Sequence, residues 1–286
     1  ADMATKVEAA KMLVYKAARK KGAMRMKLLI QSDDYGITKA VSCGIIEGIK
    51  NGVIRCTGLF VNMPSSEDAA KMIADYPEVC LGIDINLVAG KPVSDPAKVP
   101  SLIKENGYFY DSRERRKRDQ ECESHDHMDE AETYLEAKAQ IERFIALTGK
   151  KPEYLHGHAY GSPTITKVHE RLSAEYGIPM TQKILADHHV KMAKSWYTVP
   201  FSLEQQLSLS TKDFLLADRG EILGSEMAAI ISHCGYVDAP LFEVSSFTMI
   251  RAKDLEAMVS DEMKAWIKEN HIELITYRDL QADRSE

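Results

Sequence analysis

Apolar and polar residues alternate in blocks along the chain, and these blocks predict a succession of strands and helices. Residues 27–31 form a short apolar run that is typical of a buried strand. Residues 38–51 carry apolar side chains at helical spacing and end in Asn-Gly, which favours a helix terminus there. A strand, a helix and a strand are then predicted over residues 53–61, 67–76 and 79–87. This β-α-β-α-β order indicates a parallel sheet with helices outside it.

The second half of the chain continues the alternation. An amphipathic helix is predicted over residues 132–147 and another helix over residues 164–176. Short strands are predicted at residues 152–155, after residue 179, at 226–232 and at 271–276. Roughly six to eight βα units without a second domain boundary predict a single α/β domain over residues 25–286, folded as a distorted, TIM-like (β/α) barrel.

Two segments depart from this alternation. Residues 88–130 contain three prolines and continue as an almost wholly polar stretch. Such a stretch is typical of a solvated, mobile loop or, since it follows a strand, of a lid over a substrate site. Residues 1–24 are rich in Lys, Arg and Ala, with apolar residues at helical spacing. We expect them to form an appended amphipathic helix or an expression-derived extension, with the natural start at Met24 or Met26.

Composition narrows the class of protein. Of the 286 residues, 44% are hydrophobic and 28% are charged, which is ordinary for a globular domain. The net charge of −6 demands no nucleic-acid partner, and no apolar run reaches the ~18 residues that span a membrane. The five cysteines are widely spaced without a CxxC pair, so we expect free thiols and a cytoplasmic location. A homodimer is expected only because such assemblies are common.

Ionisable residues gather where the predicted strands end, which is the active face of a (β/α) barrel. Asp33 and Asp34 follow the first strand. Two adjacent carboxylates stay ionised only beside a compensating cation or hydrogen-bond donors. One is therefore a candidate metal ligand and the other a candidate proton acceptor, while a helix N-cap is the alternative for either.

Further candidates end the later strands. His156 and His158 frame a glycine, and alternate residues of an extended segment face one side, so both imidazoles can approach one metal ion. Asp84 lies in an apolar strand and needs a partner such as a metal ion, unless it faces solvent on an edge strand. His233 is the candidate for the opposite proton-transfer role. Arg251 either orients a carboxylate or a substrate oxygen, or is a solvated surface residue.

These ordered segments resemble the YdjC-like family of carbohydrate deacetylases, which includes chito-oligosaccharide and hopanoid-associated members. The similarity extends over about residues 27–280, and its main segments are LLIQSDDYG at 28–36, GIDINL at 82–87, GYF at 107–109, residues 152–161 and SHCGYVD at 232–238. The resemblance implies a distorted (β/α) barrel that removes N-acetyl groups from an amino sugar or small oligosaccharide with a divalent metal ion.

The resemblance also implies roles for individual residues. Asp33 would be the base that activates water, and His233 would assist the leaving amine. Asp34 and His158 would bind the metal ion, which polarises the acetyl carbonyl and lowers the pKa of the attacking water.

Two positions depart from the family pattern. Asp84 stands where the family usually has His in Gly-Leu-His-Leu-Asn, and His156 stands where it usually has Asp. We infer a compensated exchange in which Asp84 and His156 trade places and both bind the metal ion; the rival is a decayed or altered metal site. Carboxylates with one or two imidazoles lie between the preferences of Mg²⁺ and Zn²⁺. Tyr35, Asn86 and Arg251 complete the predicted site as substrate contacts.

Two other functions stay open on this basis. One is a metal-dependent hydrolase of a phosphoester or glycosidic bond, and the other is a catalytically weakened barrel that binds carbohydrate. The expected partner is a small carbohydrate substrate, with no nucleic acid and no membrane. Release of acetate distinguishes the deacetylase from both alternatives.

Overall fold

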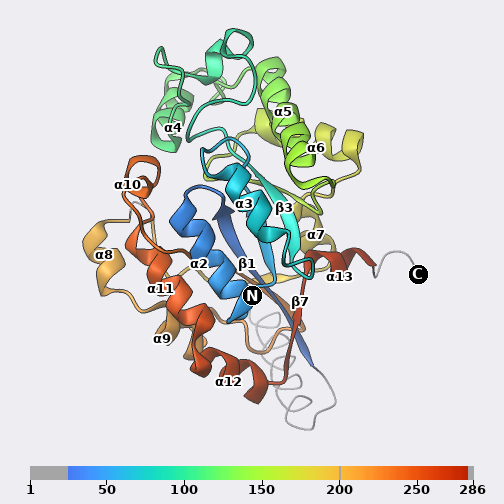
Figure 1. Ribbon diagram of the computed structural model, residues 1–286, viewed down its shortest axis with the longest axis vertical. Coiled ribbons are helices and arrows are strands. Elements are labelled where there is room, and N and C mark those ends of the chain that lie inside the picture. Colours follow the sequence, from blue (N-terminus) through green and yellow to red (C-terminus); the bar gives the residue numbers. More distant parts are fainter. Residues whose placement is uncertain (1–24, 200, 283–286) are drawn as a thin grey trace, which may run out of the picture.

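The computed structural model describes residues 25–199 and 201–282, so the helix expected within residues 1–24 lies outside the described residues. Within these ranges, helices surround a parallel sheet (Figure 1). The strands are β1 (Met26–Tyr35), β2 (Cys56–Leu59), β3 (Cys80–Ile85), β4 (Leu155–Gly157), β5 (Lys191–Met192), β6 (Met227–Ser232) and β7 (Ile272–Ile275). The helices up to β5 are α2 (Lys39–Lys50), α3 (Ser66–Ile73), α4 (Ser112–Glu121), α5 (Glu130–Thr148), α6 (Pro163–Tyr176) and α7 (Thr181–Asp187), with 3₁₀ turns at Pro96–Lys98 and Pro100–Leu102. The later helices are α8 (Leu203–Ser208), α9 (Thr211–Leu216), α10 (Leu241–Val244), α11 (Met249–Val259), α12 (Asp261–Glu269) and α13 (Tyr277–Ala282).

The sheet is parallel throughout, in the order β4-β3-β2-β1-β6-β5, with β7 pairing alongside β1. β1 is its centre: the first half pairs with β7, the second half pairs with β2, and β6 follows the other edge. Among the described residues no ladder joins β4 to β5, so the sheet forms a half-barrel. The prediction of a distorted (β/α) barrel is confirmed in this open form.

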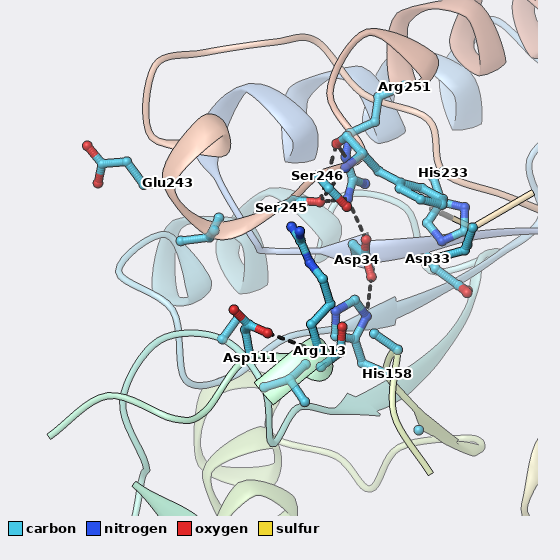
Figure 2. Close-up of a pocket in the computed structure, with 18 of the residues that line it drawn as sticks. Asp33, Asp34, Asp111, Arg113, His158, His233, Glu243, Ser245, Ser246 and Arg251 are labelled. Atoms are coloured by element: carbon cyan, nitrogen blue, oxygen red, sulfur yellow. Dashed lines mark hydrogen bonds and ion pairs between the residues drawn. The ribbon is translucent and has the colours of Figure 1, made fainter. Parts of the chain in front are cut away.

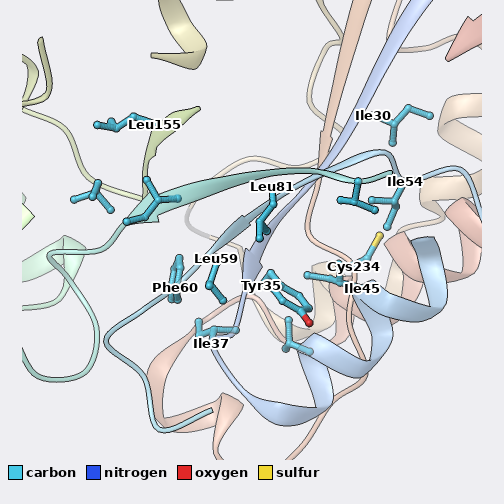
Figure 3. Packing of buried hydrophobic residues seen from close by; sticks show 14 of the residues in the cluster. Ile30, Tyr35, Ile37, Ile45, Ile54, Leu59, Phe60, Leu81, Leu155 and Cys234 are labelled. Atoms are coloured by element: carbon cyan, nitrogen blue, oxygen red, sulfur yellow. The ribbon is translucent and has the colours of Figure 1, made fainter. Parts of the chain in front are cut away.

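Alternate residues of the strands belong to two separate cores. Leu28 and Ile30 of β1 lie in the core that includes Ile45 of α2 (Figure 3). Leu29 lies in a second cluster with Tyr154 and Tyr277, which Ile184 of α7 and Leu280 of α13 join. Because both faces of the strands are covered, the sequence shows them as continuous apolar runs rather than as alternating patterns.

The polar segment predicted as a mobile loop contains the helix α4, which corrects that expectation. Arg115 of α4 is fully buried and donates to two backbone carbonyl groups at 2.8 and 2.9 Å. Asp119 accepts a hydrogen bond from the hydroxyl of Tyr160 at 2.8 Å and lies 2.6 Å from Nδ1 of His127. The periodicity of the sequence could not show this helix as packed, because polar side chains rather than an apolar stripe attach it to the fold.

Other expectations can be compared with the described residues directly. The strand predicted after residue 179 is reduced to a bridge between Met180 and Leu155, after which α7 begins. The five cysteines are free, as predicted. None of the described helices combines the length and the apolar character needed to cross a membrane.

Gly82 of β3 provides a test of the packing against Tyr154, a member of the second cluster. A Cβ atom at Gly82 would lie 2.2 Å from the ring of Tyr154. We expect Gly82→Ala to lower the free energy of unfolding by about 1–3 kcal/mol, because overpacking displaces a buried ring. Gly161→Ala is the control, since a Cβ there meets no atom within 4 Å. Urea denaturation measures both variants, and equal stabilities would contradict the close approach.

Candidate active site

A pocket of about 470 Å³ lies where the carboxyl ends of β1, β4 and β6 meet (Figure 2). Side chains from these strand ends, from the start of α4 and from the segment around α10 form its walls. The ionisable residues that line it are Asp33, Asp34, Asp111, Arg113, Arg116, His156, His158, His233, Glu243 and Arg251. Most of the ionisable residues singled out in the sequence therefore share one pocket, as expected for a parallel sheet.

A bulge at the end of β1 turns two adjacent carboxylates toward this pocket. The register of β1 against β2 shifts between Ser32 and Tyr35, and Asp34 adopts a φ of 71°. In a regular strand Asp33 and Asp34 would face opposite sides, whereas here both line the pocket. The backbone N–H of Asp34 also donates to Oδ2 of Asp84 at 3.0 Å, which connects the bulge to β3.

Asp33, Asp84 and His156 each bring one ligand atom to within 4.8 Å of the others, and we call these residues the ligand cluster. Asp84 and His156 are register partners on β3 and β4. Nε2 of His156 lies 3.5 Å from Oδ2 of Asp33. The glycine at position 58 leaves space for the cluster, because a Cβ atom there would lie 1.9 Å from Oδ1 of Asp84.

Burial acts on every charge of the ligand cluster. Burial and the neighbouring Asp33 carboxylate raise the pKa of Asp84 to about 7. Burial opposes the charge of His156, but the carboxylates of Asp33, Asp84 and Asp34 together outweigh it and raise the pKa of His156 to about 9. Oδ1 of Asp84 is buried and has no hydrogen-bond partner among the described residues. Because a divalent cation would satisfy this oxygen and offset both carboxylates, the residues present fit a bound metal ion.

Asp34 lies between a guanidinium and an imidazole. Nη2 of Arg251 lies 2.6 Å from its Oδ2, and Nδ1 of His158 lies 2.8 Å from its Oδ1 (Figure 2). Burial opposes the ionisation of Asp34, but His158 and Arg251 outweigh it and hold the pKa of Asp34 well below its usual value. Asp34 and His158, both predicted as metal ligands, therefore contact each other and lie outside the ligand cluster.

His233 follows β6 and lines the pocket. Its backbone N–H donates to Oδ2 of Asp254 at 2.8 Å. Asp254 is fully buried on α11 and accepts hydrogen bonds from two further side chains at 3.0 and 2.7 Å. The rings of Tyr197 and Phe247 flank the imidazole, with centroids 6.1 and 5.0 Å away. These contacts fix the end of the strand and leave the imidazole of His233 facing the pocket.

The three predicted substrate contacts have different positions. Tyr35 is fully buried and its hydroxyl donates to the carbonyl of Ala69 at 2.7 Å. Asn86 is also fully buried and both donates to and accepts from the backbone of Ala89, a residue that lines the pocket. Neither Tyr35 nor Asn86 is among the residues that line the pocket, so a substrate contact by either one stays a prediction. Arg251 does line it, although its guanidinium contacts Asp34.

Sequence reasoning missed one polar wall and one aromatic wall of the pocket. These residues are Asp111, Arg113 and Arg116 on the α4 side, and Tyr197, Phe242 and Phe247 on the other. The charged residues on the α4 side belong to a polar stretch of the sequence. Such a stretch does not indicate which cavity its side chains will line, because that depends on how α4 packs. Asp254 left a weaker signal, since it lies at helical spacing with the apolar residues Ile250, Leu255 and Met258 that α11 buries.

Comparison with known proteins gives one consistent result. Residues 27–269 match the family described as YdjC-like protein. "Carbohydrate deacetylase 2" of Listeria innocua is 33% identical over 263 residues, with 89% of this chain and 99% of that protein covered. A carbohydrate deacetylase of Geobacillus stearothermophilus is 31% identical over 258 residues, with 88% and 97% covered.

A solved structure from Enterococcus faecalis shares the fold. That protein is provisionally named a cellobiose-phosphate cleavage protein, and it matches with a TM-score of 0.71 at 26% identity. The match covers 90% of this chain and 99% of that one. The fold, the arrangement of strand-end residues and the extent of these matches together show that the chain belongs to the YdjC-like family.

Proposed function

We propose that this protein is a carbohydrate deacetylase that hydrolyses the N-acetyl group of an amino sugar or small oligosaccharide with a bound divalent metal ion. The ligand cluster, beside the pocket-lining His233, carries the proposal. The names of the Listeria and Geobacillus relatives agree with it, and their similarity extends over almost their whole length. Metal ligands, a proton acceptor and a proton donor at one pocket are what amide hydrolysis requires.

Asp84 and His156 would hold the metal ion, with Asp33 at the edge of the same cluster. When bound, the ion would polarise the acetyl carbonyl and lower the pKa of the attacking water. Because Asp84 and His156 are register partners, exchanging Asp and His between their positions keeps both groups beside the same site. This geometry supports the compensated exchange over a decayed site. Two carboxylates with one imidazole suit Mg²⁺ or Zn²⁺.

The side chains of the protein would move the protons. Asp33 would take a proton from the water that attacks the acetyl carbon. The carbon–nitrogen bond would break as His233 donates a proton to the leaving amine, which yields acetate and the free amino sugar. Asp34 and His158 as additional ligands stay a prediction, since their contact at 2.8 Å would have to open for either to join the ion.

The polar wall on the α4 side of the pocket suggests which substituent the carbohydrate substrate carries. Arg113 lines the pocket and extends from the α4 side in the view of Figure 2. Among residues 25–199 and 201–282 its guanidinium has no ion pair, whereas Arg116 donates to the carbonyl of Ala159 at 2.7 Å. An unengaged guanidinium suits an anionic substituent such as a phosphate. The name of the Enterococcus neighbour refers to a phosphorylated disaccharide, which is consistent with such a preference.

The metal requirement can be tested on the ligand cluster. We expect the wild-type protein to release acetate from N-acetylglucosamine oligomers with Mg²⁺, Mn²⁺ or Zn²⁺, and to lose this activity in a chelator. Asp84→Ala and His156→Ala should each remove most of the bound metal, because the remaining ligands lose a buried partner. Elemental analysis measures the metal, and Asp75→Ala, an exposed position, is the control. Unchanged metal content in both variants would contradict the hypothesis of a compensated exchange.

Proton transfer is tested separately from metal binding. Asp33→Asn and His233→Ala should keep the metal but lower kcat by about 100-fold or more, the usual loss when a general acid or base is removed. If Asp33→Asn loses its metal, Asp33 acts as a ligand and the proton acceptor is another group. Sugar binding without acetate release under any of the three ions would favour the weakened carbohydrate-binding barrel. Cleavage of a phosphoester or glycosidic bond instead would favour the other hydrolase.

The preference for an anionic substrate is tested with Arg113→Ala. We expect this variant to raise KM for a phosphorylated amino-sugar substrate by about 10-fold, the effect of losing roughly 1.4 kcal/mol of binding, and to leave KM for the unphosphorylated substrate nearly unchanged. Arg219→Ala removes the same charge from an exposed position outside the pocket lining and is the control. Equal KM changes for the two substrates would contradict the preference.

A further inference from the structure

A hydroxyl group lies beside the imidazole of His156, at the ring nitrogen that does not face Asp33. Nδ1 of His156 lies 2.8 Å from Oγ1 of Thr181, whereas Nε2 lies 3.5 Å from Oδ2 of Asp33. Thr181 is 2% exposed, so bulk water does not compete for its hydroxyl. The two ring nitrogens of His156 therefore have separate partners: one faces the ligand cluster and the other faces a buried, uncharged hydroxyl.

The position of Thr181 is set by the same strand that carries His156. Thr181 is the first residue of α7, and the preceding Met180 bridges to Leu155 of β4. The backbone N–H of Leu155 donates to the carbonyl of Pro179 at 2.9 Å. This bridge and this hydrogen bond hold the start of α7 beside β4, next to His156. Threonine is also β-branched and has few side-chain rotamers, which limits the positions of its hydroxyl.

A second cavity, of about 240 Å³, borders this contact. Thr181, Gln182 and His169 line it, and Gly157 and Ala159 line both this cavity and the substrate pocket. Thr181 thus lines the cavity that borders β4 and does not line the pocket of the candidate active site. The cavity also decides the choice of variant: truncation to alanine would let water replace the hydroxyl, whereas valine fills the same volume without offering a hydrogen-bond acceptor.

We propose that Thr181 is a positioning residue that accepts the Nδ1 proton of His156 and so keeps the lone pair of Nε2 directed at the ligand cluster. A neutral imidazole carries one proton, and holding it at Nδ1 leaves Nε2 free for a cation. Partners of this kind orient metal-binding histidines, and their loss typically lowers metal affinity by about 10–100-fold. The inference rests on the proposed function, because it concerns the ion that the cluster would hold.

The test compares three variants of the full chain. Thr181→Val removes the acceptor at constant volume, and we expect calorimetric titration with Zn²⁺ or Mg²⁺ to show about 10-fold weaker binding or worse. Thr181→Ser restores a hydroxyl and should bind close to the wild-type affinity. Thr166→Val is the matched control, because Thr166 lines the same cavity but its hydroxyl donates to the carbonyl of Ser162 at 3.1 Å. Thermal unfolding verifies that each variant is folded.

A spectroscopic measurement separates positioning from a structural role. Nitrogen-15 shifts of the His156 ring, measured without metal at a pH where the ring is neutral, should report a proton on Nδ1 in the wild-type and Thr181→Ser proteins, and a mixture of tautomers in Thr181→Val. Wild-type affinity and an unchanged ring signature in Thr181→Val would overturn the positioning role alone. A wild-type protein that binds none of the ions would instead overturn the proposed function and the inference with it.

Discussion

Three buried carboxylates at the carboxyl edge of a parallel sheet are the constraint that the rest of this site satisfies. Asp33, Asp34 and Asp84 are 7%, 1% and 0% exposed, and like charges at this depth repel one another. A buried charge that loses its partner costs about 3–5 kcal/mol. Arg251 on α11 and the imidazoles delivered by β4 supply positive charge against them. In the ligand cluster, one oxygen of Asp84 still lacks a partner, and a bound cation would supply one. The negative charge that the fold buries is therefore the charge that the proposed chemistry uses.

Backbone conformation makes this concentration of charge achievable. Asp34 has a left-handed φ of 71°, which costs a non-glycine residue about 1–2 kcal/mol. Its ion pairs with Arg251 and His158, and its backbone hydrogen bond to Asp84, compensate for that strain. The absence of a side chain at position 58 then gives the Asp84 carboxylate its space. The left-handed conformation of Asp34 and the glycine at position 58 thus allow side chains from β1 and β3 to lie in one site.

The walls of the pocket follow different rules from its charged end. On one side, α4 is attached through the buried Arg115 and through Asp119, and it presents Arg113 to the pocket. On the other side, Tyr197 and Phe247 pack around His233. The groups proposed for catalysis lie at the ends of strands. The α4 side of the pocket instead belongs to the long segment between β3 and α5. The residues proposed to recognise a charged substituent therefore lie on a different element from the ligand cluster.

The sequence by itself determined the strands β1 to β4, β6 and β7, the helices α2, α3, α5 and α6, the (β/α) class and the strand ends that carry Asp33, His156 and His233, because apolar periodicity and chain order are local properties. Tertiary structure decided the register that makes Asp84 the direct partner of His156, since register depends on how whole strands pair. It also placed the hydroxyl of Tyr35 against the backbone carbonyl of Ala69 and formed the helix α4 where a mobile loop was expected. Such outcomes depend on partners distant in the sequence, which no local pattern encodes.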